Sequence, residues 1–452
     1  MAKSKANFVC SNCGATFSKW SGKCDNCDEW NTLIEQTAAE AAEGKSALAK
    51  GKISGKHLET VSIKDIIPSD ETARLSTGFK DLDAVLGGGF LLGSVTLLTG
   101  QPGIGKSTLL MQICSEVSNS SPALYISGEE SAGQVKMRAE RLGAKSEDLH
   151  FASSTSGNDI AKTIEDGQFQ LVIVDSIQTL SLAELTSAPG AVSQVTNCGN
   201  LIIRAAKSSN TAVVIVGHVT KDGSLAGPKV LEHLVDVVIN FEGDRYGGFK
   251  TVRAIKNRFG STTEVAIFEM NQRGLVEVQN PSAALLAERQ NNDGSIILST
   301  LEGTRPILVE IQALATPSAF GYPKRAASGY DINRLNLLIA VLERRTRLKL
   351  NDKDIFINVV GGLRVQDSAA DLAICLAIAS AVAKRKLPES YVVFGEVGLG
   401  GEIRSAFRPD QRISEAKKLG FKHAIAPMTA KDSFVIPVRD LRTTLIKYMN
   451  EE

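Results

Sequence analysis

An α/β fold in several domains is predicted by three features of the sequence. An apolar segment leads directly into a glycine-rich loop and a helix, two cysteine pairs stand near the N-terminus, and apolar strands and helices fill the last third. The chain has 452 residues, which leaves room for two to four domains at roughly 100 to 200 residues each. Because 43% of the residues are hydrophobic, each domain can form a normal core.

The composition indicates where in the cell the protein is found more clearly than what it does. The formal net charge is only +1, so any binding site for a nucleic acid has to be local. The N-terminus lacks the apolar segment of a signal peptide, and no uninterrupted apolar run reaches about 18 residues. Cys114, Cys198 and Cys375 lie scattered in apolar stretches, which suits a reducing compartment. We therefore predict a cytoplasmic protein with no membrane association.

The first 34 residues contain two CxxC pairs with ten residues between them, formed by Cys10, Cys13, Cys24 and Cys27. Two closely spaced thiolate pairs supply the four ligands of a tetrahedral zinc site, and metal ligation would stabilise a module too short to bury a core. Two disulfides or a redox CxxC are the alternative, which is disfavoured because no thioredoxin-like unit surrounds the pairs. We predict a zinc finger over residues 1–34, and the sequence leaves open whether it binds DNA or a partner protein. Residues 35–58, rich in Ala, Gly and Lys, predict a linker.

The strongest motif is GQPGIGKST, which fits the phosphate-binding pattern G-x4-G-K-[ST] between a predicted strand and a predicted helix. Its backbone N–H groups are expected to surround the phosphates of ATP or ADP. Lys106 should reach the outer phosphates, and the Ser107 hydroxyl should ligate Mg²⁺. The predicted nucleotide contacts are Gly100, Gln101, Pro102, Gly103, Ile104, Gly105, Lys106, Ser107 and Thr108.

Polar residues follow three further apolar strands, and ligands in open α/β sheets gather at the carboxyl ends of the strands. Asp175 ends the segment LVIVD and is expected to bind Mg²⁺ through water, although a helix cap is the ordinary role of such a residue. Glu129 follows ALYIS and could polarise the attacking water, or lie in a solvated loop. His218 ends AVVIVGH and is placed to sense the γ-phosphate or the substrate, with a structural role equally open. Two glycine-containing segments, 185–199 and 220–236, have the composition of loops that track a phosphate backbone.

The segment KNRFG, residues 256–260, places Lys256 and Arg258 on either side of an asparagine. As an isolated stretch it predicts a solvated, glycine-terminated turn. Its alternative role is to bind an anion, and the five residues alone do not decide between the two.

These segments together resemble the bacterial RadA (Sms) family of DNA repair proteins, which are relatives of RecA. The resemblance rests on the glycine-rich loop, YISGEES, LVIVDS, GHVTKDG and above all KNRFG, behind a four-cysteine finger, and it extends over nearly the whole chain. It implies a RecA-like ATPase domain over residues 59–275 that forms a hexameric ring and binds single-stranded and branched DNA. It also implies work alongside the RecA recombinase, by driving branch migration of recombination intermediates.

The resemblance also implies roles for individual residues. Glu129 is the counterpart of the catalytic glutamate, and Asp175 joins the nucleotide site. In ring-forming relatives of RecA, a segment like KNRFG lies at the subunit boundary. Lys256 and Arg258 are therefore expected to reach the γ-phosphate bound by the neighbouring subunit, as an arginine finger does. Contact with DNA in the channel is the alternative.

Residues 285–452 resemble the proteolytic domain of Lon, an α+β domain with a serine nucleophile and a lysine base. In this chain the segment DSAAD places Ala369 at the serine position, and Ser368, one residue away, would point about 100° elsewhere on a helix. The lysine position falls in RPDQR, residues 408–412, which contains no lysine, and arginine stays protonated and cannot act as a base. We therefore predict a peptidase fold without peptidase activity.

A basic stretch over residues 324–353 contains eight Lys or Arg against three acidic residues. It predicts either phosphate contacts to DNA or a solvated face. Three classes of function remain at this point: an ATP-driven DNA motor, an ATP-dependent peptidase, and a nucleotide switch of the clock-protein type. The motifs favour the first, and only a motor would show ATP turnover stimulated by DNA.

Overall fold

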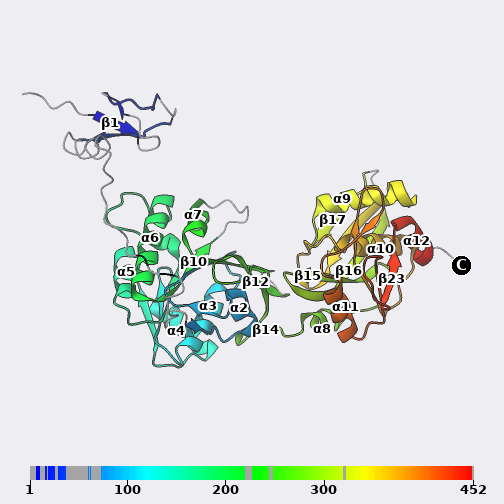
Figure 1. The fold of residues 1–452 in the computed structure, drawn as a ribbon, viewed down its shortest axis with the longest axis horizontal. Coiled ribbons are helices and arrows are strands. Elements are labelled where there is room, and N and C mark those ends of the chain that lie inside the picture. Colours follow the sequence, from blue (N-terminus) through cyan, green and yellow to red (C-terminus); the bar gives the residue numbers. More distant parts are fainter. Residues whose placement is uncertain are drawn as a thin grey trace, which may run out of the picture. The chain divides into compact units, whose positions relative to one another are not determined.

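A computed structural model describes residues 7–10, 16–17, 19–25, 29–36, 60, 62, 73–218, 226–243, 248–318 and 322–449 (Figure 1). The chain divides into two compact units, Met1–Pro68 and Ser69–Glu452, which are treated separately below. Among the described residues, no helix is both long enough and apolar enough to cross a bilayer. The predicted linker lies outside the described residues apart from its first two, Glu35 and Gln36.

The N-terminal unit contains a small antiparallel sheet in the order β2-β1-β3. Its strands are β1 (Asn7–Cys10), β2 (Thr16–Phe17) and β3 (Leu33–Gln36). Cys10, Cys24 and Leu33 are buried together, with Phe8 and Phe17 packed against them. Two of the four predicted zinc ligands therefore lie in the centre of the module. Cys13 and Cys27 lie outside the described residues.

A nine-stranded sheet forms the first half of the larger unit, in the order β14-β13-β12-β11-β6-β10-β9-β7-β8. Its bounds are β6 (Val95–Gly100), β7 (Ala123–Ser127), β8 (Leu149–Ser153), β9 (Leu171–Asp175), β10 (Ala212–His218), β11 (Val237–Gly243), β12 (Lys250–Asn257), β13 (Val265–Asn271) and β14 (Gly274–Glu277). Strands β6 to β11 are parallel, and β12 to β14 complete the sheet antiparallel. Every residue of β6, β7 and β9 is buried, as expected for parallel strands covered on both faces.

Helices cover both faces of this sheet (Figure 1). One apolar core joins the sheet to α2 (Lys80–Leu86), α3 (Lys106–Val117) and α4 (Ala132–Leu142). The other joins it to α5 (Gly157–Glu165), α6 (Val192–Ser209) and α7 (Ala226–Leu234). A short hairpin of β4 (Arg74–Leu75) and β5 (Phe90–Leu91) precedes β6, and a 3-10 turn, η3 (Ile177–Thr179), follows β9.

The second half of the unit is built on a seven-stranded sheet in the order β17-β18-β16-β15-β19-β22-β23. Its strands are β15 (Ser295–Glu302), β16 (Arg305–Pro317), β17 (Arg325–Ser328), β18 (Lys353–Val359), β19 (Tyr391–Val393), β22 (His423–Pro427) and β23 (Val435–Val438), and a separate hairpin is formed by β20 (Glu396–Val397) and β21 (Ile403–Arg404). The helices are α8 (Pro281–Leu286), α9 (Ile332–Val341), α10 (Ala370–Ala383), α11 (Pro409–Lys418) and α12 (Leu441–Met449), with short turns η4 (Leu342–Thr346) and η5 (Val360–Gly362). Helix α10 is buried from Ala370 to Ser380, which explains why its sequence is apolar nearly all round.

The turn between β15 and β16 packs against the first half of the unit. Gly303, with φ +61°, lies so close to Thr263 that a Cβ would meet the Thr263 carbonyl oxygen at 1.9 Å. The Thr304 N–H donates to the same carbonyl at 2.8 Å, and Arg305 forms an ion pair with Asp81 at 2.5 Å. The predicted boundary between residues 275 and 285 remains a prediction, because these contacts make Ser69–Glu452 one compact unit.

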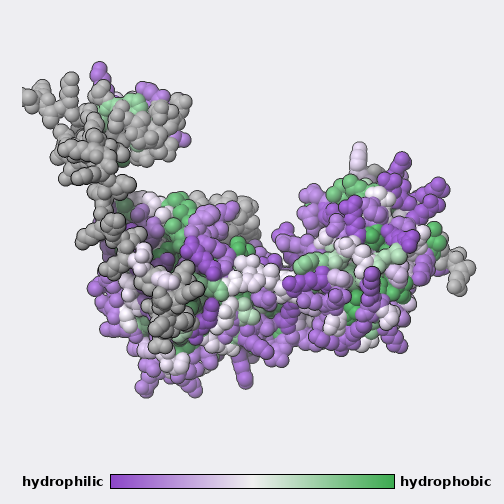
Figure 2. All heavy atoms as spheres, viewed as in Figure 1, coloured by the Kyte–Doolittle hydropathy of each residue, from purple (hydrophilic) through white to green (hydrophobic). Residues whose placement is uncertain are grey.

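On the face drawn in Figure 2, hydrophilic side chains cover most of the described surface of Ser69–Glu452. Hydrophobic side chains occur there in small groups rather than as one broad apolar face.

Candidate active site

The glycine-rich loop leaves the carboxyl end of β6 and leads into α3. Gly105 precedes the helix with φ +118°, a conformation that side chains rarely adopt, and a Cβ there would meet Met270 Cε at 2.8 Å. The first N–H groups of α3 have no partner within the helix and are available to phosphate oxygens. The loop therefore has the backbone geometry that its sequence predicts.

The Lys106 amine lies over this loop. Its Nζ donates to the carbonyl oxygens of Gly100 at 2.8 Å and Gln101 at 3.1 Å. Burial lowers the pKa of Lys106 to about 8, and the nearby carboxylates of Asp175 and Glu129 oppose that shift. A phosphate group would add a negative charge close to the amine, which favours its protonated form.

Ser107 and Asp175, the predicted magnesium ligands, lie together. The Ser107 hydroxyl donates to Asp175 Oδ2 at 2.8 Å, and the Tyr125 hydroxyl donates to the same oxygen at 2.6 Å. Hydroxyl and carboxylate oxygens are the donors that Mg²⁺ prefers, so the residues fit the ion. Burial, followed by the charge of Asp175, keeps the pKa of Tyr125 well above its usual range, so Tyr125 remains a donor.

Glu129 stands at the end of β7 and contacts residues from two other strands. Its Oε1 accepts from the Ser176 hydroxyl at 2.6 Å and lies 3.4 Å from His218 Nε2, and its side chain is 45% exposed. The strand register explains this meeting, because Ser127 pairs with Asp175 and His218 pairs with Gly100 at the same edge of the sheet. A partly exposed carboxylate fixed beside the phosphate loop can orient and polarise a water molecule.

Sequence reasoning missed two residues of this site. Tyr125 is a single hydroxyl in an otherwise apolar strand and is 1% exposed, and a buried tyrosine hydroxyl usually needs a partner. That signal could have found it. Gln178 Nε2 lies 3.4 Å from the His218 carbonyl oxygen, and in the described part of the chain its Oε1 is buried with no hydrogen-bond partner. Nothing in the sequence marks Gln178.

KNRFG lies at the opposite edge of the sheet from the nucleotide loop of the same chain. Lys256 pairs with Val238, which pairs with Leu97, three residues before Gly100 in β6. At a rise of about 3.3 Å per residue, the two sites are roughly 10 Å or more apart along the strands. The structure therefore does not bring Lys256 or Arg258 into the site that contains Lys106, Glu129 and Asp175.

Within KNRFG, the two cations have different surroundings. Lys256 Nζ donates to the carbonyl oxygens of Glu232 at 2.8 Å, His233 at 3.2 Å and Val235 at 2.8 Å. These residues lie at and directly after the C-terminus of α7. The Arg258 side chain is 52% exposed, and its Nη1 lies 3.4 Å from Asp236 Oδ1.

The turn itself is fixed to α2. Asn257 Nδ2 donates to the Val85 carbonyl oxygen at 3.1 Å, and Asn257 Oδ1 accepts from the Phe259 N–H at 2.9 Å. Gly260 is required by close approach, because a Cβ there would meet Gly87 Cα at 2.9 Å. The turn is thus anchored by its asparagine and glycine, while about half of the Arg258 side chain is exposed.

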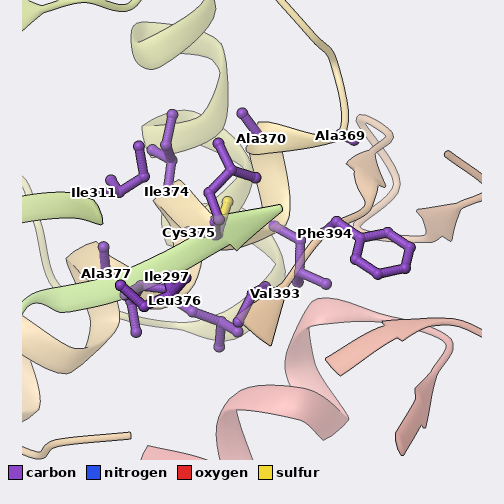
Figure 3. Close-up of a cluster of buried hydrophobic side chains, with 14 of the residues drawn as sticks. Ile297, Ile311, Ala369, Ala370, Ile374, Cys375, Leu376, Ala377, Val393 and Phe394 are labelled. Atoms are coloured by element: carbon purple, nitrogen blue, oxygen red, sulfur yellow. The ribbon is translucent and has the colours of Figure 1, made fainter. Parts of the chain in front are cut away.

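The Lon-like region has no polar group at its serine position. Ala369 precedes α10, is 1% exposed and lies beside the buried cluster that contains Phe394 (Figure 3). The Ser368 hydroxyl donates instead to Glu396 Oε2 at 2.9 Å. Arg412 is fully buried, with Nη2 2.7 Å from Asp367 Oδ2 and Nη1 donating to the Ser299 carbonyl oxygen at 2.6 Å.

Several cations of the basic stretch over residues 324–353 have partners within their own domain. Arg334 pairs with the buried Asp371, Arg325 donates to the Leu350 carbonyl oxygen at 2.9 Å, and Arg345 Nε donates to the Leu399 carbonyl oxygen at 3.2 Å. Exposed cations remain at Lys324, Arg344, Arg347 and Lys349.

Comparison with known proteins gives three family matches along the chain. Residues 8–35 match a rubredoxin metal binding domain, residues 65–224 match an AAA domain, and residues 335–430 match subunit ChlI of Mg-chelatase. These matches confirm the predicted fold class: a zinc ribbon, a RecA-like ATPase core and a C-terminal Lon-like domain.

Curated relatives align with almost the whole chain. The DNA repair protein RadA of Bacillus subtilis (strain 168) is 47% identical over 442 residues, which cover 97% of this chain and 95% of the relative. Those of Haemophilus influenzae and Escherichia coli (strain K12) are both 46% identical, over 433 and 430 residues. They cover 95% and 94% of this chain, and 94% of each relative. A crystal structure of the RadB recombinase aligns with 45% of this chain and 100% of its own, at 24% identity and with a TM-score of 0.37.

Proposed function

Because this chain belongs to the RadA family of DNA repair proteins, we propose that it is a DNA-dependent ATPase of recombinational repair. It processes recombination intermediates alongside the RecA recombinase and promotes branch migration, as a hexameric ring on single-stranded or branched DNA. One observation carries the ATPase assignment. Lys106 and Ser107 at the start of α3, Asp175 at the end of β9 and Glu129 just after β7 lie together at one edge of the sheet.

The roles of these residues follow from their contacts. The backbone N–H groups of residues 100–108, Pro102 excepted, surround the phosphates of ATP, and the Lys106 amine exchanges its loop carbonyls for phosphate oxygens. Ser107 and Asp175 hold magnesium, which neutralises phosphate charge when it is bound. Glu129, fixed by Ser176, orients the attacking water.

A further cation would stabilise the charge that develops on the γ-phosphate during transfer. Arg258 and Lys256 of the neighbouring subunit supply it, because they lie at the opposite edge of the sheet and a head-to-tail ring brings the two edges together. Hydrolysis therefore requires the ring. A cation supplied in this way is worth about 10³ to 10⁵ in rate in other systems.

The other parts serve this activity. Cys10, Cys13, Cys24 and Cys27 bind zinc in the N-terminal module, and the buried positions of Cys10 and Cys24 suit ligands at the centre of a small fold. Segments 185–199 and 220–236 contact DNA. The C-terminal domain does not cleave peptides, since Ala369 has no hydroxyl and Arg412 is committed to an ion pair, and its exposed cations contact DNA phosphates.

ATP turnover with and without single-stranded DNA tests the proposal, on the wild type and on Lys106→Ala. We expect DNA to stimulate phosphate release by the wild type, and Lys106→Ala to lose turnover while remaining folded. Turnover that DNA leaves unchanged would contradict a DNA motor and favour a nucleotide switch. Cleavage of casein by the wild type would contradict the absence of peptidase activity.

A further inference from the structure

The environment of Lys256 differs from that of a cation waiting for an anion. An ammonium group has three N–H donors, and the three carbonyl oxygens of Glu232, His233 and Val235 lie within 3.2 Å of Nζ. Glu232 and His233 belong to the last turn of α7, where helix carbonyls have no partner within the helix, and Val235 follows the helix directly. Lys256 therefore caps α7, although it stands on β12 and is more than twenty residues away in sequence.

Helix α7 in turn packs against α6. Leu231 is fully buried, and it lies so close to Gly199 of α6 that a Cβ on Gly199 would meet Leu231 Cδ2 at 2.4 Å. This contact leaves no room for the helices to slide past each other without a change in packing. The first part of α6, up to Gly199, lies in segment 185–199, and α7 lies in segment 220–236, the two segments proposed to contact DNA. The ammonium of Lys256 thus caps one helix of the pair α6 and α7, and both of these helices include residues of the segments proposed to contact DNA.

Binding the neighbour's phosphate and capping α7 compete for the same donors. With all three donors used on α7, the Lys256 amine must release at least one carbonyl to bind a phosphate oxygen. Arg258 is less committed, since half of its side chain is exposed and its ion pair with Asp236 spans 3.4 Å. Burial, and next the charge of Arg258, lower the pKa of Lys256. An anion at this position would be attracted by both cations.

We propose that Lys256 is a positioning residue with two alternative sites, the C-terminus of α7 and the γ-phosphate bound by the neighbouring subunit. When the neighbour holds ATP near the transition state, Lys256 leaves α7, and the helix pair beside the DNA-contacting segments is loosened. After phosphate release, Lys256 returns and caps α7 again. The nucleotide state of one subunit thereby reaches the DNA contacts of the next. This inference rests on the trans arrangement of the proposed function and adds what the lysine does when no phosphate is present.

Hydrogen exchange of the backbone amides of residues 226–236 tests the inference in the full-length oligomer. The variants are Lys256→Met, which removes the ammonium but keeps an unbranched side chain, and Lys136→Met, the same change at an exposed lysine of α4. Each is measured with ADP and with ADP, magnesium and aluminium fluoride, which stands for the transferring phosphate. We expect slow exchange in the wild type with ADP, and exchange roughly tenfold faster with aluminium fluoride, as for the loss of a charged hydrogen-bond partner.

Lys256→Met should exchange at the fast rate under both conditions, and Lys136→Met should follow the wild type. Equal exchange of α7 in Lys256→Met and wild type with ADP would overturn the capping role. Exchange in the wild type that aluminium fluoride leaves unchanged would overturn the switch, even if Lys256→Met fails to fold. Loss of the trans arrangement is detected separately, by mixing subunits that lack Lys106 with subunits that lack Arg258. Complementation in that mixture with no response of α7 contradicts this inference alone, whereas no complementation contradicts the proposed function.

Discussion

Two loops in this chain lead into a helix at a position where enzymes often place reacting groups, and they differ in what their polar groups contact. At the loop before α3, the Lys106 amine rests on two backbone carbonyls, and Glu129 is 45% exposed beside it. At the turn before α10, Arg412 is fully buried on Asp367, and Ala369 has no polar group at all. The first loop has groups that a ligand can take over, while the second has used its groups to stabilise the fold. Polar groups whose present partners can be replaced by a ligand therefore mark a binding site better than polar groups that are committed to the fold.

The largest effect is expected from breaking the ion pair of the second loop. Arg412→Met leaves the Asp367 carboxylate without its buried partner and should destabilise the C-terminal domain by about 3 to 5 kcal/mol. The midpoint of denaturant unfolding, followed by proteolysis of that domain, measures it. Arg404→Met, at an exposed pair with Glu402, is the control and should cost less than about 1 kcal/mol. Equal small losses in both variants would show that Arg412 is not a structural residue.

A pH dependence distinguishes the first loop from the second. Since burial lowers the pKa of Lys106 to about 8, the amine loses its proton as the pH rises through that value. Folding favours the neutral amine, so the contribution of this lysine to the stability of the free protein increases as the pH rises from about 8 to 10.5, whereas phosphate binding favours the charged form. ATP affinity should therefore fall above pH 8, by up to about tenfold per pH unit.

Titration of ATP binding by calorimetry between pH 7 and 9.5 measures this dependence. Lys106→Arg is the control, because arginine stays protonated over this range and should remove the dependence whatever its affinity at pH 7. The same slope in wild type and Lys106→Arg would show that another group titrates.

A smaller effect is expected at Tyr125, whose hydroxyl donates to Asp175, the predicted magnesium ligand. Tyr125→Phe removes one hydrogen bond to Asp175 Oδ2 and should cost about 1 kcal/mol in metal binding, or roughly a fivefold rise in the magnesium concentration for half-maximal turnover. ATP binding measured in EDTA should change little. A loss of binding without metal as well would mean that Tyr125 supports the fold of the loop rather than the position of Asp175.

No effect on peptide cleavage is expected when a hydroxyl is restored at the second loop. Ala369→Ser supplies the nucleophile but no base, because the nearest counterpart of the base, Arg412, stays protonated and paired. Casein digestion and labelling by a fluorophosphonate probe should both remain negative. Labelling of Ala369→Ser, with the wild type unlabelled, would show that the site retains an activating group.

The sequence predicted most of the first loop and little of what surrounds it. The P-loop, Asp175, Glu129 and His218 could be found because each follows an apolar strand, and parallel strands end at a common edge. Tyr125 and Gln178 form hydrogen bonds to residues that are distant in sequence. The spacing of apolar residues along the chain does not reveal such partners. The roles of the KNRFG cations remain a prediction, as do the zinc ligands Cys13 and Cys27, which lie outside the described residues.

The stabilising pairs were the least predictable part. Lys256 meets carbonyls of a helix that begins thirty residues earlier, and Arg412 meets a carboxylate 45 residues away in sequence. Such partners depend on how the strands are ordered in the sheet, and neither residue type nor spacing specifies that order. The absence of a serine at position 369 and of a lysine in residues 408–412 could be read from the sequence, but the ion pair at this position could not.

The central claim is that the nucleotide site is completed by the neighbouring subunit, and mixing two inactive variants tests it most directly. Lys106→Ala subunits keep Arg258, and Arg258→Ala subunits keep the nucleotide loop. Each variant alone should turn over ATP at a small fraction of the wild-type rate, with nucleotide binding retained in Arg258→Ala. In a one-to-one mixture, roughly a quarter of the interfaces pair an intact loop with an intact arginine, so turnover should recover to about that fraction of wild type. Wild-type turnover by Arg258→Ala alone, or a mixture as inactive as its two components, would contradict the account.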